Sequence, residues 1–298
     1  MYAVRDWRFG GPGEFTVARC RCCGVAALLG APGDEPAALY PENYPAHVAS
    51  TPPPARPARA YWAAVARNVA LGYPQPPLAG ARRHLVRAAR PLLRRWALTR
   101  PYPRYWPGGR LLDVGCGRGD FLLGMRACGW QVTGLDVSAR AVALAQARGL
   151  EVAAGTIERA GWAAGTFAAI TFLDSFEHGD QPRAMLAAAG RLLAPGGELL
   201  IRFPNFGSLW RQVFGPYWAD IAAPRHRFFY TRAVLRRMVA AAGFAVTGCY
   251  RQPSADFSRS LRTWRRAHGH AGAELWPWAR VVDRVCADGH CLLRARRE

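Results

Sequence analysis

A glycine-rich segment near the middle of the chain constrains the fold more than any other feature of the sequence. Arg110–Val114 is a short apolar run typical of a buried strand, and it leads directly into the loop Gly115-Cys-Gly-Arg-Gly119. Asp120–Cys128 then shows helical periodicity, and Gln131–Val137 is the next predicted strand. A strand, a glycine loop, a helix and a second strand in this order predict the unit with which open α/β sheets bind nucleotides.

The alternation of strands and helices continues towards the end of the sequence. Further strands are predicted at Leu150–Ala153, Phe167–Leu173, Glu198–Phe203, Phe244–Tyr250 and His290–Arg296. Further helices are predicted at Ala139–Arg148, after an N-cap at Ser138, and at Pro182–Leu193 and Thr231–Ala242. This order predicts an α/β protein with a doubly wound, mostly parallel sheet, and a ligand site at the carboxyl ends of the strands.

The spacing of the glycines separates this loop from the loops of nicotinamide and flavin enzymes. Gly115, Gly117 and Gly119 follow a Gly-x-Gly-x-Gly pattern, whereas dinucleotide-binding loops have Gly-x-Gly-x-x-Gly. Asp113 ends the first strand, and its carboxylate suits a ligand with a cationic end, such as the amino group of methionine. The same carboxylate would repel a pyrophosphate.

A second acid, Asp136, ends the second predicted strand. A carboxylate at this position can accept hydrogen bonds from both hydroxyls of a ribose. The alternative is that Asp136 only caps the helix that starts after Ser138. Two acids at adjacent strand ends, one on either side of the glycine loop, favour the ribose role.

Five segments, taken in order, resemble the successive motifs of class I S-adenosylmethionine-dependent methyltransferases, and in particular the ubiquinone-biosynthesis-type O-methyltransferases. They are Leu111–Phe121, Val132–Ser138, Phe176-Glu-His178, Leu192-Leu-Ala-Pro-Gly-Gly197 and Phe203-Pro-Asn205. The resemblance covers roughly residues 105–250. It implies a Rossmann-like methyltransferase fold and S-adenosyl-L-methionine as the cofactor, with its methionine part held by Asp113 and the loop glycines and its ribose held by Asp136.

The resemblance also indicates where the adenine would bind. Many relatives have an acid after the third strand, and the matching place here is Gly155-Thr-Ile-Glu158, with Thr156 where Asp is usual. We therefore expect adenine contact through Ile157, Glu158 or the backbone. Val137, beside Asp136, and Asp174, at the end of the fourth strand, complete the predicted cofactor contacts.

The candidate catalytic residues follow the fourth strand and precede the last predicted helix. Methyl transfer to a neutral hydroxyl needs a base, and His178, directly after Glu177, lies where the strand end faces the cofactor. His226 lies in a Pro-Arg-His stretch similar to one in the same methyltransferase subgroup. Three roles stay open for Glu177 and His178: general base, ligand of a divalent metal together with Asp174, as the resemblance implies for some relatives, or purely structural.

The only clustered cysteines lie near the start of the sequence. Cys20-Arg-Cys-Cys-Gly24 contains one C-x-x-C pair followed by glycine, the shape of a zinc knuckle. Related methyltransferases often carry a ribbon with two such pairs, followed by a stretch like Leu39-Tyr-Pro-Glu-Asn-Tyr44. Residues 1–50 are therefore predicted to form a partial zinc-ribbon-like module, and zinc is not expected because a closed site needs four ligands.

The remaining chain is predicted to divide into two parts. Residues 51–104 hold an extended Pro- and Arg-rich linker at 51–60 and a basic helical segment at 81–99 that Pro91 interrupts. Residues 105–298 form the methyltransferase domain, with an Arg- and Trp-rich insertion at about 252–289 and an aromatic insertion at about 206–230. The aromatic insertion, with Trp210 and Trp218, either overhangs the acceptor as a lid or packs on the surface without substrate contact.

The charge of the chain is large and uneven. All 40 basic residues are arginine, the net charge is +20, and residues 51–110 carry 12 of the arginines and no acid. We therefore expect an anionic substrate, carrier or surface as a partner, including peripheral contact with such a surface. No uncharged run reaches 18 residues and Met1–Asp6 lacks an apolar signal core, so a cytoplasmic protein without a transmembrane segment is predicted.

The expected reaction is O-methylation of a small molecule, a glycan or a lipid-linked intermediate. A nucleic-acid methyltransferase that uses the Arg-rich flanks is the first alternative, although the Asn-Pro-Pro-aromatic signature of many base N-methylating enzymes is missing after the fourth strand. A non-catalytic scaffold that binds the cofactor without turnover is the second alternative.

Overall fold

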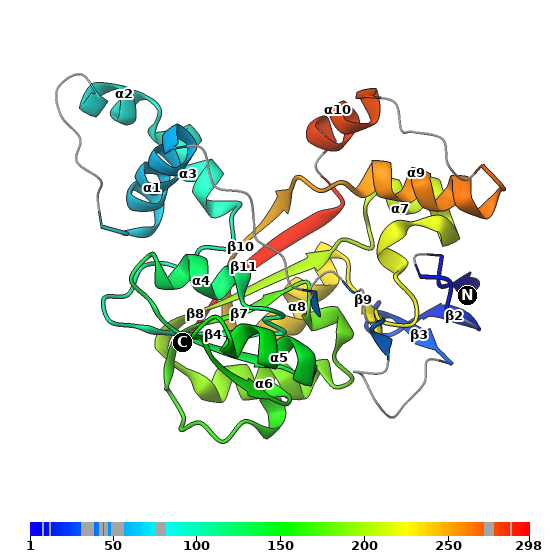
Figure 1. Ribbon diagram of the computed structural model, residues 1–298, viewed down its shortest axis with the longest axis horizontal. Coiled ribbons are helices and arrows are strands. Elements are labelled where there is room, and N and C mark those ends of the chain that lie inside the picture. Colours follow the sequence, from blue (N-terminus) through cyan, green and yellow to red (C-terminus); the bar gives the residue numbers. More distant parts are fainter. Residues whose placement is uncertain are drawn as a thin grey trace.

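A computed structural model describes the following residues of the chain: 1–7, 9–11, 13–30, 39–41, 44, 47–48, 57–74, 82–270, 277–286 and 288–298. In Figure 1 the main sheet lies in the middle, a small sheet lies beside the N-terminus, and two groups of helices project at the upper edge.

The main sheet has seven strands in the order β10-β11-β8-β7-β4-β5-β6. Strands β4 to β8 run parallel to one another, whereas β11 runs antiparallel to both β8 and β10. The strands are β4 (Arg110–Val114), β5 (Gln131–Asp136), β6 (Glu151–Ala154), β7 (Phe167–Leu173), β8 (Leu193–Pro204), β10 (Phe244–Gln252) and β11 (His290–Arg297). The doubly wound, mostly parallel sheet predicted from the sequence is therefore confirmed.

The strand order reverses between β4 and β7. The chain proceeds from β4 through β5 to β6 on one side and from β7 to β8 on the other. Helices α4 (Asp120–Arg126), α5 (Ala139–Gln146), α6 (Pro182–Leu192) and α8 (Arg232–Ala241) accompany these strands (Figure 1). A crevice outside the carboxyl ends of β4 and β7 is the expected ligand site of such a sheet.

The helices begin where the sequence predicts but end slightly earlier. The Ser138 hydroxyl accepts a hydrogen bond from the backbone N–H of Ala141, 3.3 Å away, as an N-cap does. The predicted ends at Cys128 and Arg148 were two residues too late, because the backbone turns there towards Gly129 and Gly149, which both adopt positive φ.

The small sheet combines the N-terminal module with a strand from far along the chain. Its antiparallel order is β1-β2-β3-β9, with β1 at Tyr2–Arg5, β2 at Glu14–Arg19, β3 at Ala26–Leu29 and β9 at Phe228–Phe229. The cluster Cys20, Cys22 and Cys23 lies in the exposed turn between β2 and β3.

The aromatic segment before β9 packs on this small sheet. It contains α7 (Leu209–Phe214) and the 3-10 turns η5 (Gly215–Tyr217) and η6 (Ala219–Ile221). Phe214, Trp218 and Ile221 share one buried cluster with Val4, Phe15 and Val17 of the N-terminal strands. Of the two roles open for this segment, packing is the one that the positions of Trp210 and Trp218 favour.

Helices flank the main sheet at two places. Residues 57–98 contain α1 (Pro57–Leu71), α2 (Arg82–Ala88) and α3 (Arg90–Leu98), and α9 (Asp256–Ala267) and α10 (Pro277–Val285) lie near the other end. The basic helical segment predicted at 81–99 is divided at Ala89, just before Pro91, in agreement with the interruption predicted at that proline. The predicted extended linker was wrong for residues 57–60, which form the first turn of α1. Proline is tolerated at the first helical position, and Ala and Arg favour helix. Residues 51–56 of the predicted linker lie outside the described residues.

None of the helices in the described part of the chain is long and apolar enough to cross a membrane.

Candidate functional site

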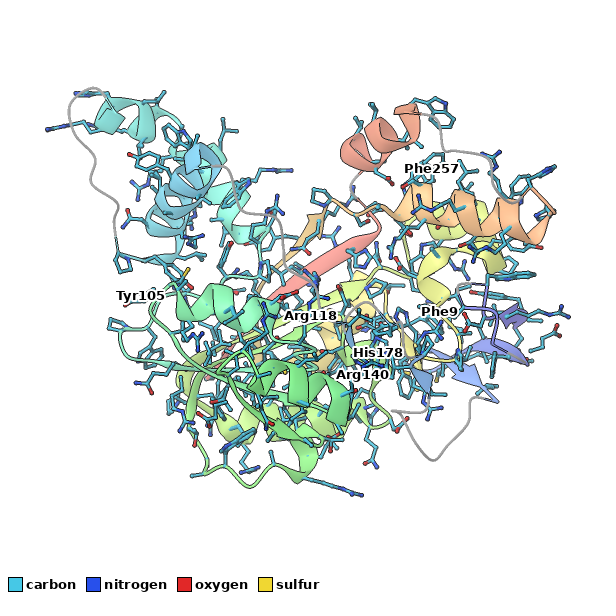
Figure 2. The ribbon with its side chains drawn as sticks, viewed as in Figure 1. Phe9, Tyr105, Arg118, Arg140, His178 and Phe257 are labelled. Atoms are coloured by element: carbon cyan, nitrogen blue, oxygen red, sulfur yellow. The ribbon has the colours of Figure 1, made fainter. Side chains whose placement is uncertain are left out.

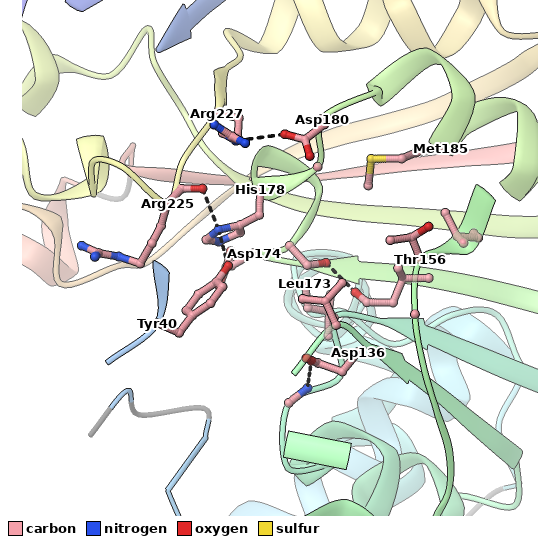
Figure 3. A pocket seen from close by; sticks show the side chains of 18 of the residues that line it. Tyr40, Asp136, Thr156, Leu173, Asp174, His178, Asp180, Met185, Arg225 and Arg227 are labelled. Carbon is pink, nitrogen blue, oxygen red and sulfur yellow. Dashed lines mark hydrogen bonds and ion pairs between the residues drawn. The ribbon is translucent and has the colours of Figure 1, made fainter. Parts of the chain in front are cut away.

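A cavity of about 680 Å³ opens at the carboxyl ends of β4, β5 and β7. Figure 3 shows its lining. The loops after the strands of the main sheet contribute Val114, Gly115, Gly117, Asp136, Val137, Gly155–Arg159, Leu173–Ser175 and His178–Gln181. Arg202, Arg225 and Arg227 line it from β8 and the segment before β9, and Leu39, Tyr40, Tyr44 and His47 line it from the N-terminal region.

The glycine loop brings backbone to the edge of the cavity. Gly115, Gly117 and Gly119 have φ of 74°, 54° and 81°, a region that other residues rarely adopt. A Cβ at Gly115 would collide with the side chain of Ser175, and one at Gly119 would collide with Leu150. Gly119 lies at the start of α4, outside the lining, whereas Gly115 and Gly117 line the cavity and leave their backbone accessible to a ligand.

Asp136 lies at the end of β5 with acceptor capacity to spare. Its Oδ2 accepts a hydrogen bond from the N–H of Gly117 at 2.8 Å, and its Oδ1 accepts one from the N–H of Ser138 at 2.9 Å (Figure 3). Each carboxylate oxygen can accept a second hydrogen bond. Because Ser138 caps α5 with its own hydroxyl, helix capping does not account for Asp136, and the geometry fits the ribose role.

Asp113 is placed differently from Asp136. Its side chain is 3 % exposed and lies outside the lining of the cavity, and it accepts a hydrogen bond from the Thr171 hydroxyl at 2.6 Å. Burial raises the pKa of Asp113 to about 7. Direct contact between this carboxylate and a bound amino group therefore stays a prediction that the geometry does not favour.

The residues predicted to contact the adenine lie in the loop after β6 and directly after Asp136. Ile157 is fully buried at the start of η3 (Ile157–Arg159) and lines the cavity together with Thr156 and Glu158. Val137 lines the same end and is 38 % exposed. Two apolar side chains, Val137 and Ile157, thus line the cavity with Asp136, Thr156 and Glu158, an arrangement that fits a nucleoside.

Asp174 lies at the end of β7 in a strained conformation. Its φ is 57°, which is uncommon for a residue other than glycine. It forms an ion pair with Arg202, with 2.7 Å between Oδ2 and a guanidinium nitrogen. Burial alone would raise the pKa of Asp174, but Arg202 and His290 hold that pKa below its usual value. The carboxylate is thus charged and already committed to Arg202.

His178 lies in the wall of the cavity, in the short turn η4 (Phe176–His178) after β7. Its Nδ1 is 2.9 Å from the hydroxyl of Tyr40 and 3.1 Å from the carbonyl oxygen of Arg225 (Figure 3). Burial lowers the pKa of His178 to about 4. The imidazole is therefore neutral at pH 7 and able to accept a proton.

Glu177 and His226 lie behind His178 and do not line the cavity. The rings of His178 and His226 are 4.7 Å apart, and Nε2 of His226 is 3.9 Å from Oε1 of Glu177. Glu177 is 1 % exposed, and neither of its carboxylate oxygens has a hydrogen-bond partner. Burial, together with the charge of Asp174, raises the pKa of Glu177 well above its usual value, and burial lowers that of His226.

These three side chains also satisfy the distance requirement of a metal site. One ligand atom from each of Glu177, His178 and His226 lies within 4.8 Å of the others, and no second group of this kind occurs among the residues that the structure describes. The predicted set was Asp174, Glu177 and His178. The structure instead pairs Asp174 with Arg202 and brings His226 to Glu177, because the segment before β9 folds back against η4.

Sequence reasoning missed several residues of the cavity wall. Tyr40, Tyr44 and His47 come from the N-terminal region, and the similarity of Leu39–Tyr44 to a stretch in related methyltransferases was the one signal for them. Arg225 pairs with Asp6 of the N-terminal module at 2.9 Å, and Arg227 pairs with Asp180 at 2.9 Å. No sequence pattern connects residues so far apart.

Curated proteins match this chain over about a third of its length. The ubiquinone biosynthesis O-methyltransferase of Xanthomonas oryzae pv. oryzae is 38% identical over 105 residues, which are 33% of this chain and 44% of that protein. The protein of the same name from Dechloromonas aromatica is 36% identical over 105 residues, 33% of this chain and 45% of its own length. The chain thus spans less than half of the curated relatives that it matches.

Two solved structures are similar over a larger share of the chain. Geranyl diphosphate C-methyltransferase from Streptomyces coelicolor is 19% identical, with 82% of this chain and 100% of that chain covered and a TM-score of 0.49. An S-adenosylmethionine-dependent methyltransferase from Mesorhizobium loti is 16% identical, with 70% and 98% covered and a TM-score of 0.48.

A family profile described as a methyltransferase domain matches residues 81–248, which is more than half of the 298 residues. The match includes β4 to β8 and every loop of the main sheet that lines the cavity. The chain therefore belongs to the methyltransferase-domain family.

Proposed function

We propose that this enzyme methylates a hydroxyl group of a small molecule, with His178 as the base that accepts the hydroxyl proton. The observation that carries the proposal is the environment of Nδ1 of His178. A phenolic hydroxyl, that of Tyr40, lies 2.9 Å from this atom at the wall of the cavity, so the site accommodates a hydroxyl at hydrogen-bond distance from a neutral imidazole.

S-adenosylmethionine supplies an electrophilic methyl group on its sulfonium. The residues of the chain supply orientation and proton transfer: Asp136 and the backbone of Gly115 and Gly117 face the nucleoside end of the cavity, and His178 faces the acceptor end. A bound acceptor hydroxyl that replaces the Tyr40 hydroxyl would give up its proton to Nδ1 of His178, in the tautomer that carries the ring proton on Nε2. As the acceptor oxygen bonds to the methyl carbon, the bond from that carbon to sulfur would break and S-adenosylhomocysteine would leave. The protonated Nδ1 would then donate to the carbonyl oxygen of Arg225, 3.1 Å away. The proton then leaves from His178 to solvent after product release.

Glu177 and His226 act in this proposal as positioning residues for His178. The Nδ1 of His226 hydrogen-bonds the carbonyl of Asp220 at 2.7 Å, which fixes its ring, and that ring packs edge-on against His178. Burial of His178 lowers its pKa and keeps the imidazole unprotonated at pH 7.

Two observations support a hydroxyl on a small molecule as the acceptor. The relatives that align with this chain over 105 residues are named ubiquinone biosynthesis O-methyltransferases. Three of the four arginines in the cavity wall are each paired with an acid, Arg202 with Asp174, Arg225 with Asp6 and Arg227 with Asp180, so these three charges are already balanced. Phenols, sugar hydroxyls and lipid-linked sugars are the acceptor classes to compare.

The direct test is release of S-adenosylhomocysteine from S-adenosylmethionine in the presence of hydroxyl, amine and carbon acceptors. Turnover with a phenolic or sugar hydroxyl, and its loss in His178→Gln, are the expected results. Turnover confined to amines, or to RNA or DNA, would reject the proposed acceptor. Tight binding of S-adenosylhomocysteine without turnover on any acceptor would favour a scaffold.

A divalent metal at Glu177, His178 and His226 is the second candidate, and one observation favours it. Glu177 is almost fully buried, and neither of its carboxylate oxygens has a hydrogen-bond partner. With the imidazoles of His178 and His226 beside it, it completes a set of donor atoms that Mn²⁺, Fe²⁺ or Zn²⁺ accepts. A bound metal would act as a Lewis acid towards the acceptor oxygen. Glu177, His178 and His226 would then be ligands, and the carbonyls of Arg225 and Asp220 would hold the Nδ1 atoms of the two imidazoles, leaving each Nε2 as the donor.

A further inference from the structure

Two groups of helices outside the catalytic cavity expose apolar side chains. The first is the α2–α3 segment, residues 82–98, and the second is α10, residues 277–285. In Figure 1 both project from the same edge of the molecule, with the main sheet below them. We refer to Leu85 and Leu92 of α2–α3, the arginines around them, and Trp278, Val281 and Val285 of α10 as the projecting surface.

The α2–α3 part of this surface is strongly basic. Leu85 and Leu92 are 55 % and 73 % exposed. Around them lie five exposed arginines: Arg83, Arg87, Arg90, Arg94 and Arg95. The sequence from residue 51 to residue 110 holds no Asp or Glu, so no acid of this segment balances the positive charge.

The α10 part is apolar along one face. Trp278, Val281 and Val285 follow each other at helical spacings of three and four and are 44 %, 55 % and 76 % exposed. The only acid in this helix, Asp283, is buried on the other side, where one of its carboxylate oxygens accepts a hydrogen bond from the N–H of Ser258 at 3.2 Å. The outward face therefore carries bulky apolar groups without a negative charge.

We propose that the projecting surface binds the headgroup region of an anionic lipid bilayer. Arginine side chains can hold lipid phosphates while their stems lie along apolar groups, and Trp, Leu and Val insert just below the headgroups. The net charge of +20 gives the attraction to an anionic surface the correct sign. The inference does not depend on the acceptor proposed above, since no residue of the projecting surface lines the cavity.

A bilayer fits these residues better than a nucleic acid. A polyanion would satisfy the arginines but leave Leu92 and Val285, each about three-quarters exposed, in water. Binding to RNA or DNA depends on phosphate contacts and base stacking and gains little from isolated aliphatic side chains. An anionic bilayer buries both kinds of side chain at once, so the apolar residues are the ones that distinguish the two partners.

Vesicle sedimentation tests the proposal with the full chain. Vesicles of equal parts phosphatidylcholine and phosphatidylglycerol should sediment the protein at low salt, and phosphatidylcholine vesicles should not. Leu85→Ser/Leu92→Ser, Val281→Ser/Val285→Ser and Arg87→Gln/Arg94→Gln should each lower the partition coefficient by about tenfold or more. Binding by the unchanged protein should weaken as salt rises, because the arginine contribution is screened.

Matched controls lie outside the projecting surface. Leu29→Ser changes a leucine of β3 that is 49 % exposed, close to the exposure of Leu85. Arg183→Gln/Arg236→Gln removes two exposed arginines from α6 and α8. These controls should keep vesicle binding within about twofold, and all variants should keep the thermal unfolding midpoint and the affinity for S-adenosylhomocysteine.

Two outcomes would overturn the proposal. One is that phosphatidylglycerol vesicles do not sediment the unchanged protein at low salt. The other is that the double arginine variant loses vesicle binding while both apolar double variants bind vesicles as the unchanged protein does. That result would indicate an electrostatic surface for a polyanion such as RNA. The response of the two apolar pairs therefore decides between a bilayer and a nucleic acid.

Discussion

The hydroxyl of Tyr40 lies 2.9 Å from Nδ1 of His178, although 138 residues separate the two along the chain. Tyr40 belongs to the N-terminal region and His178 to the turn after β7, so two parts of the sequence build one wall of the cavity. The ion pair between Arg225 and Asp6, both almost fully buried, holds these parts together. Figure 2 shows His178 at the centre of the molecule, between the main sheet and the N-terminal strands.

Tyr40→Phe should lower the acceptor KM by about fivefold and leave kcat within about twofold, because the acceptor hydroxyl no longer has to displace a neutral hydrogen bond of roughly 1 kcal/mol at His178. Affinity for S-adenosylhomocysteine should stay within about twofold, since Tyr40 faces the acceptor end. Tyr44→Phe, whose ring packs 4.8 Å from that of Tyr40, is the control for a general effect on this wall. A large fall in kcat in Tyr40→Phe would show instead that the Tyr40 hydroxyl stays on His178 during the reaction, against the proposed replacement by the acceptor.

His178→Gln should reduce kcat by about 10²- to 10⁴-fold at saturating substrates, the usual contribution of a general base. The pKa of His178 is lowered to about 4, so the neutral base persists well below the ordinary histidine value of about 6.5. We expect kcat to stay level from neutral pH down to about pH 5 and to fall only as the imidazole protonates near pH 4. A midpoint near pH 6.5 would contradict the lowered pKa of His178, and full kcat in the variant would remove the base role.

The main sheet and half of the cavity wall were predictable from the sequence because their signals are local. The strand β4, the glycine loop and Asp136 lie within 30 residues of one another, and each has its own pattern. The local pattern did not predict on which face of β4 the side chain of Asp113 lies. Side chains alternate along a strand, and Asp113 shares its face with the buried Leu111, whereas Val114 lies on the other face and lines the cavity.

The other half of the cavity wall depends on contacts between distant segments. No periodicity indicates that β9 joins the small sheet, yet this pairing carries Arg225 and His226 to the turn that holds His178. The metal set predicted from neighbouring acids omitted His226 for the same reason. Tertiary packing decides how each buried acid is paired: Asp174 forms an ion pair with Arg202, whereas Glu177 has His226 at 3.9 Å and no hydrogen bond.

Asp136→Ala should weaken S-adenosylhomocysteine binding by about 2–3 kcal/mol, as expected when two ligand hydroxyls lose a charged acceptor. Asp113→Asn is the informative comparison, because it keeps an acceptor for the Thr171 hydroxyl and lies outside the cavity lining. Its affinity, measured by calorimetry, should change by less than about threefold. An equal loss in both variants would instead place Asp113 on the amino group of the ligand.

Asp113→Asn should also change how stability depends on pH. The pKa of Asp113 is raised to about 7, so the folded state holds a proton that the unfolded state releases near pH 4. The carboxyl therefore contributes most to stability at low pH, and this contribution is lost as pH rises towards 7. In urea unfolding, the variant should be less sensitive than the unchanged protein to a rise from pH 5 to pH 8.

A metal at Glu177, His178 and His226 predicts a different set of effects. Mn²⁺ or Zn²⁺ should raise the thermal unfolding midpoint of the unchanged protein, and His226→Ala should abolish this shift. Asp174→Asn serves as the control, because Asp174 pairs with Arg202 and should not matter for the shift. If the base role is sufficient, turnover will survive EDTA and neither ion will change the unfolding midpoint.

The last prediction concerns Trp218, which sequence reasoning left as either an acceptor lid or a packed side chain. Trp218 is 1 % exposed, lies outside the cavity lining, and donates its indole N–H to Asp256 at 2.8 Å. Trp218→Phe keeps most of the buried volume but leaves Asp256 without this donor, so the free energy of unfolding should fall by about 1–3 kcal/mol.

The pH dependence of this loss separates the two roles of Trp218. Burial raises the pKa of Asp256 to about 7, and the indole N–H favours the charged form, so its removal raises that pKa further. A folded-state pKa above the unfolded value means that stability falls as pH rises, and in the variant this fall continues beyond pH 7. The loss should therefore be larger at pH 8.5 than at pH 6, with the acceptor KM unchanged. A raised KM without any loss of stability would return Trp218 to the role of a lid.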